Sequence, residues 1–450
     1  MASVRKSNSH RSHFYFCELL YILILQFLVL LCDGRHNTLW AQQQDSIKHE
    51  LIIDLEIRPR AEFRNNYKVV PADSVMPELY ISQRNRLSLT YTTMALNVHA
   101  SFQEIHVWNK AGEESAIGSI NFYELYAEHS LAKNLSVRIG RQALSFDNGR
   151  IFSAAPWAQQ SRSHEGVRLL YTKNKVITDL VWTFTRAYST AFDQTYSPIA
   201  SNQYKWLVVH HLKYTINPSL SFTTLNSIDV FEQLNDPDAY YFRLTNGGRV
   251  EYTRSDFYFT LSGYYQSGNN VALKNIHAYY IQPEIKTTLN KTTLRLGAEI
   301  LSGDGEANQN VTHSFVPLYG VAWKFMGNMN LFARFPADVN NRGLVNPYLF
   351  ISFQFDKKYS VRADGNLFYS QHSLTDARNK KAHKYLGFES DLSLNFKPLK
   401  SLELNFGFSF LLPEKSMEIL NKVSDSDTIP VWSYLMISFN PILLQYKNVR

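Results

Sequence analysis

The chain of 450 residues is poor in cysteine, and its two thiols lie near the N-terminus. Cys17 and Cys32 both precede position 41, and no cysteine follows them. The remainder of the chain can therefore form no disulfide bond and no cysteine-ligated metal site. If this remainder is exported, it must be stabilised by its topology, and a closed barrel would provide that stability.

Long apolar runs are missing beyond the first 45 residues. No later stretch is apolar over the roughly 20 residues that a transmembrane helix needs. Yet aromatic residues make up 14% of the chain, with 27 Tyr and 29 Phe, while the mean hydropathy is only −0.26. An aromatic-rich sequence of modest hydropathy fits a β protein whose two faces meet different solvents.

The first 41 residues have the pattern of a signal peptide. Basic residues come first, residues 18–32 form an apolar core, and Ala41 offers a small residue for cleavage. The alternative is a transmembrane anchor, but the apolar core is short and a polar glutamine run follows it. Lipidation at Cys32 is disfavoured because Leu31 is too large for the preceding position. We therefore expect residues 1–41 to be removed on export.

Charge is nearly balanced over the rest of the chain. The formal charge of the whole sequence is +7, and removing four basic and two acidic leader residues leaves about +5. A balance this mild predicts no nucleic-acid partner, and the placement of the charges matters more than their sum.

Apolar and polar residues alternate in segments of about ten residues from position 50 onward, as in outer-membrane strands. In residues 51–64 (LIIDLEIRPRAEFR), Leu, Ile and Phe fall on one face and Asp, Glu and Arg on the other. The same pattern returns at 82–93, 94–103, 385–398 and 401–413. The least regular segments are 204–216 and 220–232.

Short and long connectors alternate between these segments. Residues 172–175 and 397–401 are typical of tight turns. The long polar or Gly/Pro-rich connectors are 65–79, 144–163, 187–203, 302–342 and 413–430. This asymmetry is typical of barrels with short periplasmic turns and long outer loops.

The patterns together predict an all-β chain that forms one transmembrane antiparallel β-barrel over residues 48–446, with about eighteen strands. A soluble chain of this length would usually form two or three domains, but no linker is visible. A soluble β-sandwich pair or β-helix would also alternate. Such folds rarely keep Phe, Leu and Tyr on one face of so many consecutive strands.

Catalytic and metal-binding motifs are absent from the sequence. No G-x-S-x-G, H-E-x-x-H or P-loop occurs. Residues 302–310 (SGDGEANQN) contain oxygen ligands but lack EF-hand spacing. His210 and His211 are adjacent, and adjacent strand residues point to opposite faces. Ser163 and His164, the candidates for a barrel-embedded lipase, lie where a loop enters a strand. We expect no enzyme activity, no metal and no cofactor.

The polar face carries many arginines and carboxylates. If the apolar face meets lipid, the alternate residues face the lumen. The candidate pore-lining arginines are Arg58, Arg60, Arg84, Arg86, Arg138, Arg141, Arg168, Arg243, Arg295 and Arg362. The interleaved carboxylates, expected to pair with arginines, are Asp54, Glu56, Glu124, Glu128, Glu299 and Glu389. Arg138 and Arg141 differ in parity, so both can face inward only if a bulge lies between them.

These arginines have two compatible roles. Guanidinium groups fork onto carboxylates, so ladders of such pairs would brace neighbouring strands. Arginines left unpaired would form a basic constriction that admits anions. The two predicted functions are accordingly a channel for anionic saccharide and a general porin or structural barrel.

Residues 122–171 resemble the alginate export family of outer-membrane barrels. The matching positions are Gly140-Arg141-Gln142, Gly149-Arg150, Trp157, Arg162 and Gly166-Val167-Arg168. Residues 317–320 (PLYG) resemble a loop of Bacteroidetes members, whereas 146–149 (FDNG) and His164-Glu165 depart from the family pattern.

The resemblance implies an eighteen-stranded barrel in the outer membrane of a Gram-negative bacterium, in contact with its lipid. It also implies passive passage of an anionic polysaccharide or oligosaccharide, with lumen arginines lowering the barrier for uronate carboxylates. Periplasmic export components are the partners that secretion of a polymer would need.

Overall fold

The computed structural model describes residues 49–67, 76–108, 120–185, 203–233, 236–305, 308–375, 381–422 and 429–448. The predicted signal peptide lies outside these residues. No helix within the described ranges is long and apolar enough to cross a membrane.

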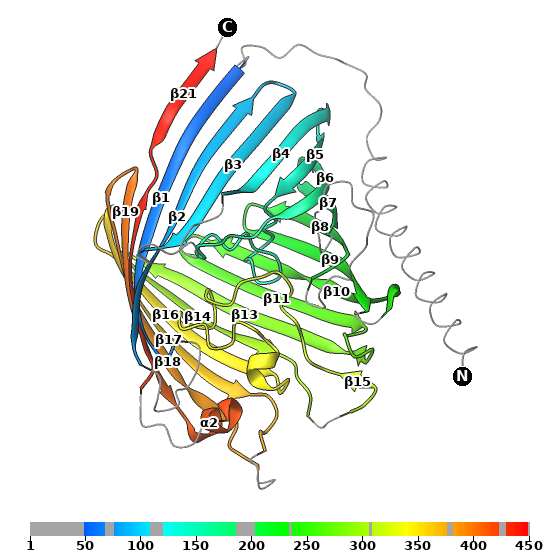
Figure 1. Cartoon of the computed structure of the whole chain (residues 1–450), viewed down its shortest axis with the longest axis vertical. Coiled ribbons are helices and arrows are strands. Elements are labelled where there is room, and N and C mark those ends of the chain that lie inside the picture. Colours follow the sequence, from blue (N-terminus) through cyan, green and yellow to red (C-terminus); the bar gives the residue numbers. More distant parts are fainter. Residues whose placement is uncertain are drawn as a thin grey trace, which may run out of the picture.

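Antiparallel strands form one continuous wall in which each strand pairs with the next (Figure 1). The first half contains β1 (His49–Asn65), β2 (Glu78–Thr92), β3 (Leu96–Val107), β4 (Asn121–Ala132), β5 (Leu135–Gln142), β6 (His164–Lys173), β7 (Val176–Phe184), β8 (Trp206–Asn217) and β9 (Leu220–Gln233). The second half contains β10 (Asp236–Arg254), β11 (Phe257–Gly268), β13 (Ala278–Leu289), β14 (Thr292–Leu301), β16 (Leu344–Gln354), β17 (Tyr359–Ser370), β18 (Tyr385–Leu399), β19 (Leu402–Pro413), β20 (Val431–Phe439) and β21 (Ile442–Asn448).

The wall closes because β20 and β21 both pair with β1. The two are one strand interrupted at Asn440 and Pro441, where the proline nitrogen cannot donate to the ladder. The contact with β1 is kept there by Leu55, whose backbone N–H donates to the Pro441 oxygen at 3.1 Å. The nineteen strands of the described sheet therefore make an eighteen-stranded barrel, which confirms the predicted fold class.

Alternation along each strand separates an outer apolar face from an inner polar one. On β11, Phe257, Leu261 and Tyr265 are each more than 40% exposed, whereas Thr260 and Ser262 are at most 1% exposed. The outer band is the surface that meets lipid. Because these polar residues of the inner face are buried, other parts of the chain must occupy the lumen beside them.

Two connections that fold inward fill this lumen (Figure 1). We call them inner loop A (residues 143–163, between β5 and β6) and inner loop B (residues 302–343, between β14 and β16). Inner loop B contains β15 (Val311–Thr312), which pairs in parallel with β12 (Asn275–Ile276), and the 3-10 helix η2 (Ala337–Val339).

Connector lengths differ between the two ends of the barrel. Turns of two to four residues, such as 133–134 and 355–358, join strands at one end, which we call the turn end. The other end, the loop end, carries both inner loops and the helix α2 (Lys415–Asn421). The long connectors 269–277 and 371–384 at the loop end were not predicted from the sequence.

Candidate functional site

Two arginines on the first two strands, Arg58 on β1 and Arg84 on β2, bind inner loop A. Arg58 and Arg84 are only 5% and 2% exposed. Arg58 donates from Nη1 to the Pro156 oxygen at 2.7 Å and from Nη2 to the Ala158 oxygen at 2.7 Å. Arg84 donates to the same Ala158 oxygen at 3.0 Å. The partners of these guanidinium groups in the loop are neutral: peptide carbonyls, the side-chain amide oxygen of Gln159 and the hydroxyl of Ser161.

Most of the other candidate pore-lining arginines form an ion pair with a carboxylate. In each case the carboxylate lies on the same strand or on an adjacent strand. The pairs are Arg60–Glu62 (2.8 Å), Arg86–Glu56 (4.0 Å), Arg138–Glu128 (2.6 Å), Arg168–Asp179 (2.7 Å), Arg243–Asp229, Arg295–Glu284 (2.6 Å) and Arg362–Asp364 (2.5 Å). These ion pairs join side chains within one strand or across neighbouring strands of the wall.

Arg141 does not face the lumen. The β5–β6 register runs without a shift from Arg138 opposite Arg168 to Arg141 opposite Glu165, so no bulge corrects the parity. Arg141 shares its face with Ile139, which is 57% exposed, and pairs with Glu165 on the outside of the barrel. The prediction that Arg141 lines the pore is therefore corrected.

Three of the six predicted carboxylates accept from arginine. Glu56 binds Arg84 at 2.7 Å, Glu128 binds Arg138, and Glu299 binds Arg150 of inner loop A at 2.7 Å. The partner of Glu299 thus comes from a loop, and not from a neighbouring strand.

The other three carboxylates have no arginine partner among the described residues. Glu124 accepts from the backbone N–H of Ala143 at 2.8 Å, and Glu389 accepts from that of Met329 at 2.8 Å. Asp54 forms no ion pair within the described ranges. Backbone amides buried inside a barrel need acceptors, so Glu124 and Glu389 anchor the inner loops.

The inner loops bind each other in the middle of the lumen. Phe152 and Tyr319 form a parallel bridge, and the N–H of Val321 donates to the Gly149 oxygen at 3.1 Å. Arg150, 2% exposed, donates to Glu299 on β14 and also to the Val321 oxygen at 3.1 Å. We call this contact the loop interlock (residues 149–153 with 319–321).

Gly320 allows the close approach of the two loops. A Cβ there would lie 1.8 Å from the Arg150 backbone oxygen, so the backbones would have to separate. We expect Gly320→Ala to cost about 1–3 kcal/mol of interlock stability and to increase cleavage of the inner loops by added protease. The matched control is Gly263→Ala, whose Cβ would meet nothing within 4 Å. Equal protection of both variants would contradict this role of Gly320.

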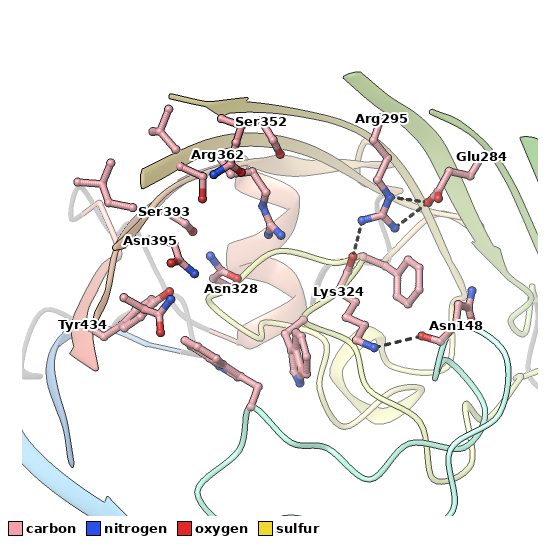
Figure 2. Close-up of a pocket in the computed structure, with 18 of the residues that line it drawn as sticks. Asn148, Glu284, Arg295, Lys324, Asn328, Ser352, Arg362, Ser393, Asn395 and Tyr434 are labelled. Carbon is pink, nitrogen blue, oxygen red and sulfur yellow. Dashed lines mark hydrogen bonds and ion pairs between the residues drawn. The ribbon is translucent and has the colours of Figure 1, made fainter. Parts of the chain in front are cut away.

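A cavity of about 640 Å³ lies between the inner loops and the wall formed by β10 to β20 (Figure 2). Its lining includes wall residues next to a turn, such as Gln354 and Ser360 on either side of residues 355–358, so it lies on the turn-end side of the loops. Four cations and one carboxylate line it: Arg249, Arg295, Arg362, Lys324 and Glu284. Aromatic and amide side chains, including Trp157, Trp323, Tyr434, Asn328 and Asn405, complete the lining.

Lys324 differs from the other cations of the cavity. The three arginines pair with Glu251, Glu284 and Asp364, whereas Lys324 has no carboxylate partner among the described residues. Its Nζ donates to the Asn148 oxygen at 3.4 Å and lies 5.5 Å from the Trp323 ring centroid. Burial, together with the charge of Arg295, lowers the pKa of Lys324.

Arg295 and Arg362 of this cavity are among the candidate pore-lining residues of the sequence analysis, whereas Arg249, Lys324 and Trp323 are not. Arg249 has the same parity on β10 as Arg243, which was predicted, so alternation could have identified it. Lys324 and Trp323 lie in inner loop B, which has no periodicity to indicate direction.

Residues of the stretches considered above for metal binding or catalysis form hydrogen bonds and ion pairs within the fold. Asp304 of the 302–310 stretch accepts from Thr312 and His313. His211 pairs with Asp147 at 3.0 Å, and His164 shares a hydrogen bond with Tyr204 at 2.8 Å. No cluster of three or more potential metal ligands occurs among the described residues.

The barrel is similar to solved outer-membrane proteins. OpdK of Pseudomonas aeruginosa, solved with vanillate, has 11% identity and a TM-score of 0.59, with 88% of this chain and 99% of that chain covered. OccK3 (OpdO) of the same organism has 12% identity and a TM-score of 0.59, covering 88% and 96%. OccAB2 of Acinetobacter baumannii has 12% identity and a TM-score of 0.60, covering 88% and 98%. Such low identities show the shared fold alone.

The family comparison covers nearly the same strands. The alginate export family matches residues 49–413, from the start of β1 to the end of β19. No curated protein matches the sequence. The closed barrel, its outer apolar band and the extent of this match place the protein in a Gram-negative outer membrane. The chain belongs to the alginate export family, and it is an outer-membrane channel.

Proposed function

We propose that this channel passes an anionic saccharide, a polymer or its oligomers, and that the solute occupies the cavity beneath the inner loops. The observation that carries the proposal is one cavity that combines Lys324 with three arginines and two tryptophans. Lys324 has no carboxylate partner in the part of the chain that the structure describes. Short turns face the periplasm in outer-membrane barrels, so the cavity lies on the periplasmic side of the loops.

The charge of the cavity favours an anion. Four cations line it, and three of them are paired with the carboxylates of Glu251, Glu284 and Asp364. Among these groups one positive charge is left, that of Lys324. Arg362 keeps 39% of its side chain exposed while it is paired. The side chain of Glu284 is only 8% exposed, so an uronate carboxylate in the cavity has more access to Arg362 than to Glu284.

The neutral lining suits a sugar ring. Trp157 and Trp323 lie with ring centroids 6.2 Å apart and present flat apolar surface. The amides of Asn395 and Asn405 and the hydroxyl of Ser393 can bind hydroxyl groups. Apolar surface with a few placed polar groups is the usual composition of a ligand site. The similar barrel OpdK was solved with vanillate, a small organic carboxylate.

The test is Lys324→Glu in planar bilayers. We expect the wild-type channel to favour anions and to be blocked by oligogalacturonate. Reversing the charge replaces an attraction by a repulsion, each worth about 1 kcal/mol, so the block should weaken roughly tenfold or more. The matched control is Lys400→Glu, in the exposed turn between β18 and β19.

Two results would contradict the proposed function. A cation-selective wild-type channel, or a channel that oligogalacturonate does not block, would favour a general porin or a structural barrel. Equal block of both variants would exclude Lys324 from the solute path.

A further inference from the structure

Positive charge is concentrated where β1 meets β2. Arg58 lies directly opposite Arg84 in the register of the two strands. Like charges placed opposite each other destabilise a sheet. Two neighbouring clusters of ion pairs hold five arginines and two carboxylates: Glu56 pairs with Arg58, Arg84 and Arg86, and Glu62 pairs with Arg60 and Arg64. The first cluster carries an excess of two positive charges and the second an excess of one.

Inner loop A covers this excess with neutral oxygen atoms. Pro156, Trp157 and Ala158 all turn their carbonyl oxygens toward the guanidinium groups of Arg58, Arg60 and Arg84. The side chain of Gln159 adds its amide oxygen, 3.1 Å from Nη2 of Arg58. These groups are the acceptors that hold the loop against the β1–β2 wall.

A carboxylate is a better partner for these guanidinium groups than a carbonyl. The donors of the present bonds are already charged, whereas their carbonyl acceptors are neutral. A carboxylate adds a negative charge on the acceptor side and can bind a guanidinium group through two parallel bonds. Carboxylates at this position would also neutralise the charge excess. An anion of suitable shape can therefore replace the carbonyl oxygens of the loop as the partner of these arginines.

We propose that Arg58, Arg60 and Arg84 form a latch that an anionic saccharide opens, its carboxylates replacing the carbonyl oxygens of residues 156–158. This inference rests on the proposed function for its solute class. Release frees inner loop A from the β1–β2 wall, while the loop interlock still joins it to inner loop B. The solute then passes between the loop and the arginines that released it.

The latch is testable with a spin label, because the chain has no cysteine after Cys32. Gln160 of inner loop A is exposed, and Gln160→Cys accepts a nitroxide there. In proteoliposomes we expect oligogalacturonate, but not a maltooligosaccharide of equal length, to increase the mobile fraction of the label. This measurement needs no change to the arginines.

Arg58→Gln in the labelled protein removes one guanidinium group from the latch. Losing hydrogen bonds to a charged group costs about 1.5–3 kcal/mol, so the mobile fraction without saccharide should rise about tenfold or more. The matched control is Arg138→Gln. It also removes one positive charge, but the partner of Arg138 is Glu128 on the neighbouring strand and not inner loop A. Its label should behave as in the wild type.

The outcomes separate this inference from the proposed function. Current block by oligogalacturonate without any change in label mobility would overturn the latch and leave the channel function intact. Equal mobility in Arg58→Gln and Arg138→Gln would also overturn it. A mobile label in a channel that is neither anion-selective nor blocked would support the latch and refute the proposed passage. Lys324→Glu should weaken the block while the label still responds.

Discussion

Replacing Arg150 with methionine is expected to weaken the closed arrangement of the inner loops by about 3–5 kcal/mol, because the change leaves a buried charge without its partner. Arg150 is 2% exposed and Glu299 is 0% exposed, with 2.7 Å between Nε and Oε1. After the change, Glu299 keeps the hydroxyl of Tyr280, at 2.6 Å, as its hydrogen-bond donor. Single-channel recording should show larger and more frequent openings.

Two further variants make this experiment specific. Arg150→Met combined with Glu299→Gln removes the unpaired charge and keeps an acceptor for Tyr280, so part of the closed state should return. Arg141→Met breaks an ion pair on the outer surface, where such pairs contribute about 0–1 kcal/mol, and should leave the recordings unchanged. If the double variant opens as often as Arg150→Met, the buried charge is not the cause.

Leu392→Arg is expected to destabilise the whole barrel by about 2–4 kcal/mol, the cost of a basic residue facing lipid at the middle of the bilayer. Leu392 lies at the centre of β18 and is 40% exposed on the outer face. Unfolding by urea in lipid vesicles, followed by tryptophan fluorescence, measures the change.

The same strand supplies the control for this variant. Leu399 is 62% exposed and adjoins the turn at 400–401, where the expected cost of arginine falls to about 0–1 kcal/mol. Equal destabilisation by Leu392→Arg and Leu399→Arg would show that depth in the membrane does not set the cost.

The barrel was predictable from the sequence because side chains alternate between the two faces of a strand. Lipid on one face requires apolar residues at every second position of each strand. Even the least regular segments became β8 and β9. The same parity placed Arg58, Arg84 and Arg295 in the lumen. Parity alone places Arg141 on the face opposite Arg138. Arg141 was nevertheless included among the pore-lining candidates because a bulge was allowed between the two, and the β5–β6 register contains no such bulge.

The contents of the lumen were not predictable in the same way. Inner loops A and B have no periodicity, and their contacts use backbone groups that every residue type carries. Nothing in the residue types of Pro156 or Ala158 indicates that their carbonyl oxygens bind Arg58. The partner of Glu299 lies 149 positions away at Arg150, and only the folded chain brings the two together.

The seam between β1 and the divided last strand has a consequence for the order of folding. It pairs Asn65 with Val431, whereas neighbouring strands elsewhere are mostly joined by short connections. Closing a loop of this length costs chain entropy on the order of 5 kcal/mol, and long-range pairings of this kind form slowly. We therefore expect the seam to be the last part of the wall to form. Both inner loops could then enter from the open side of the sheet and meet each other before the barrel encloses them.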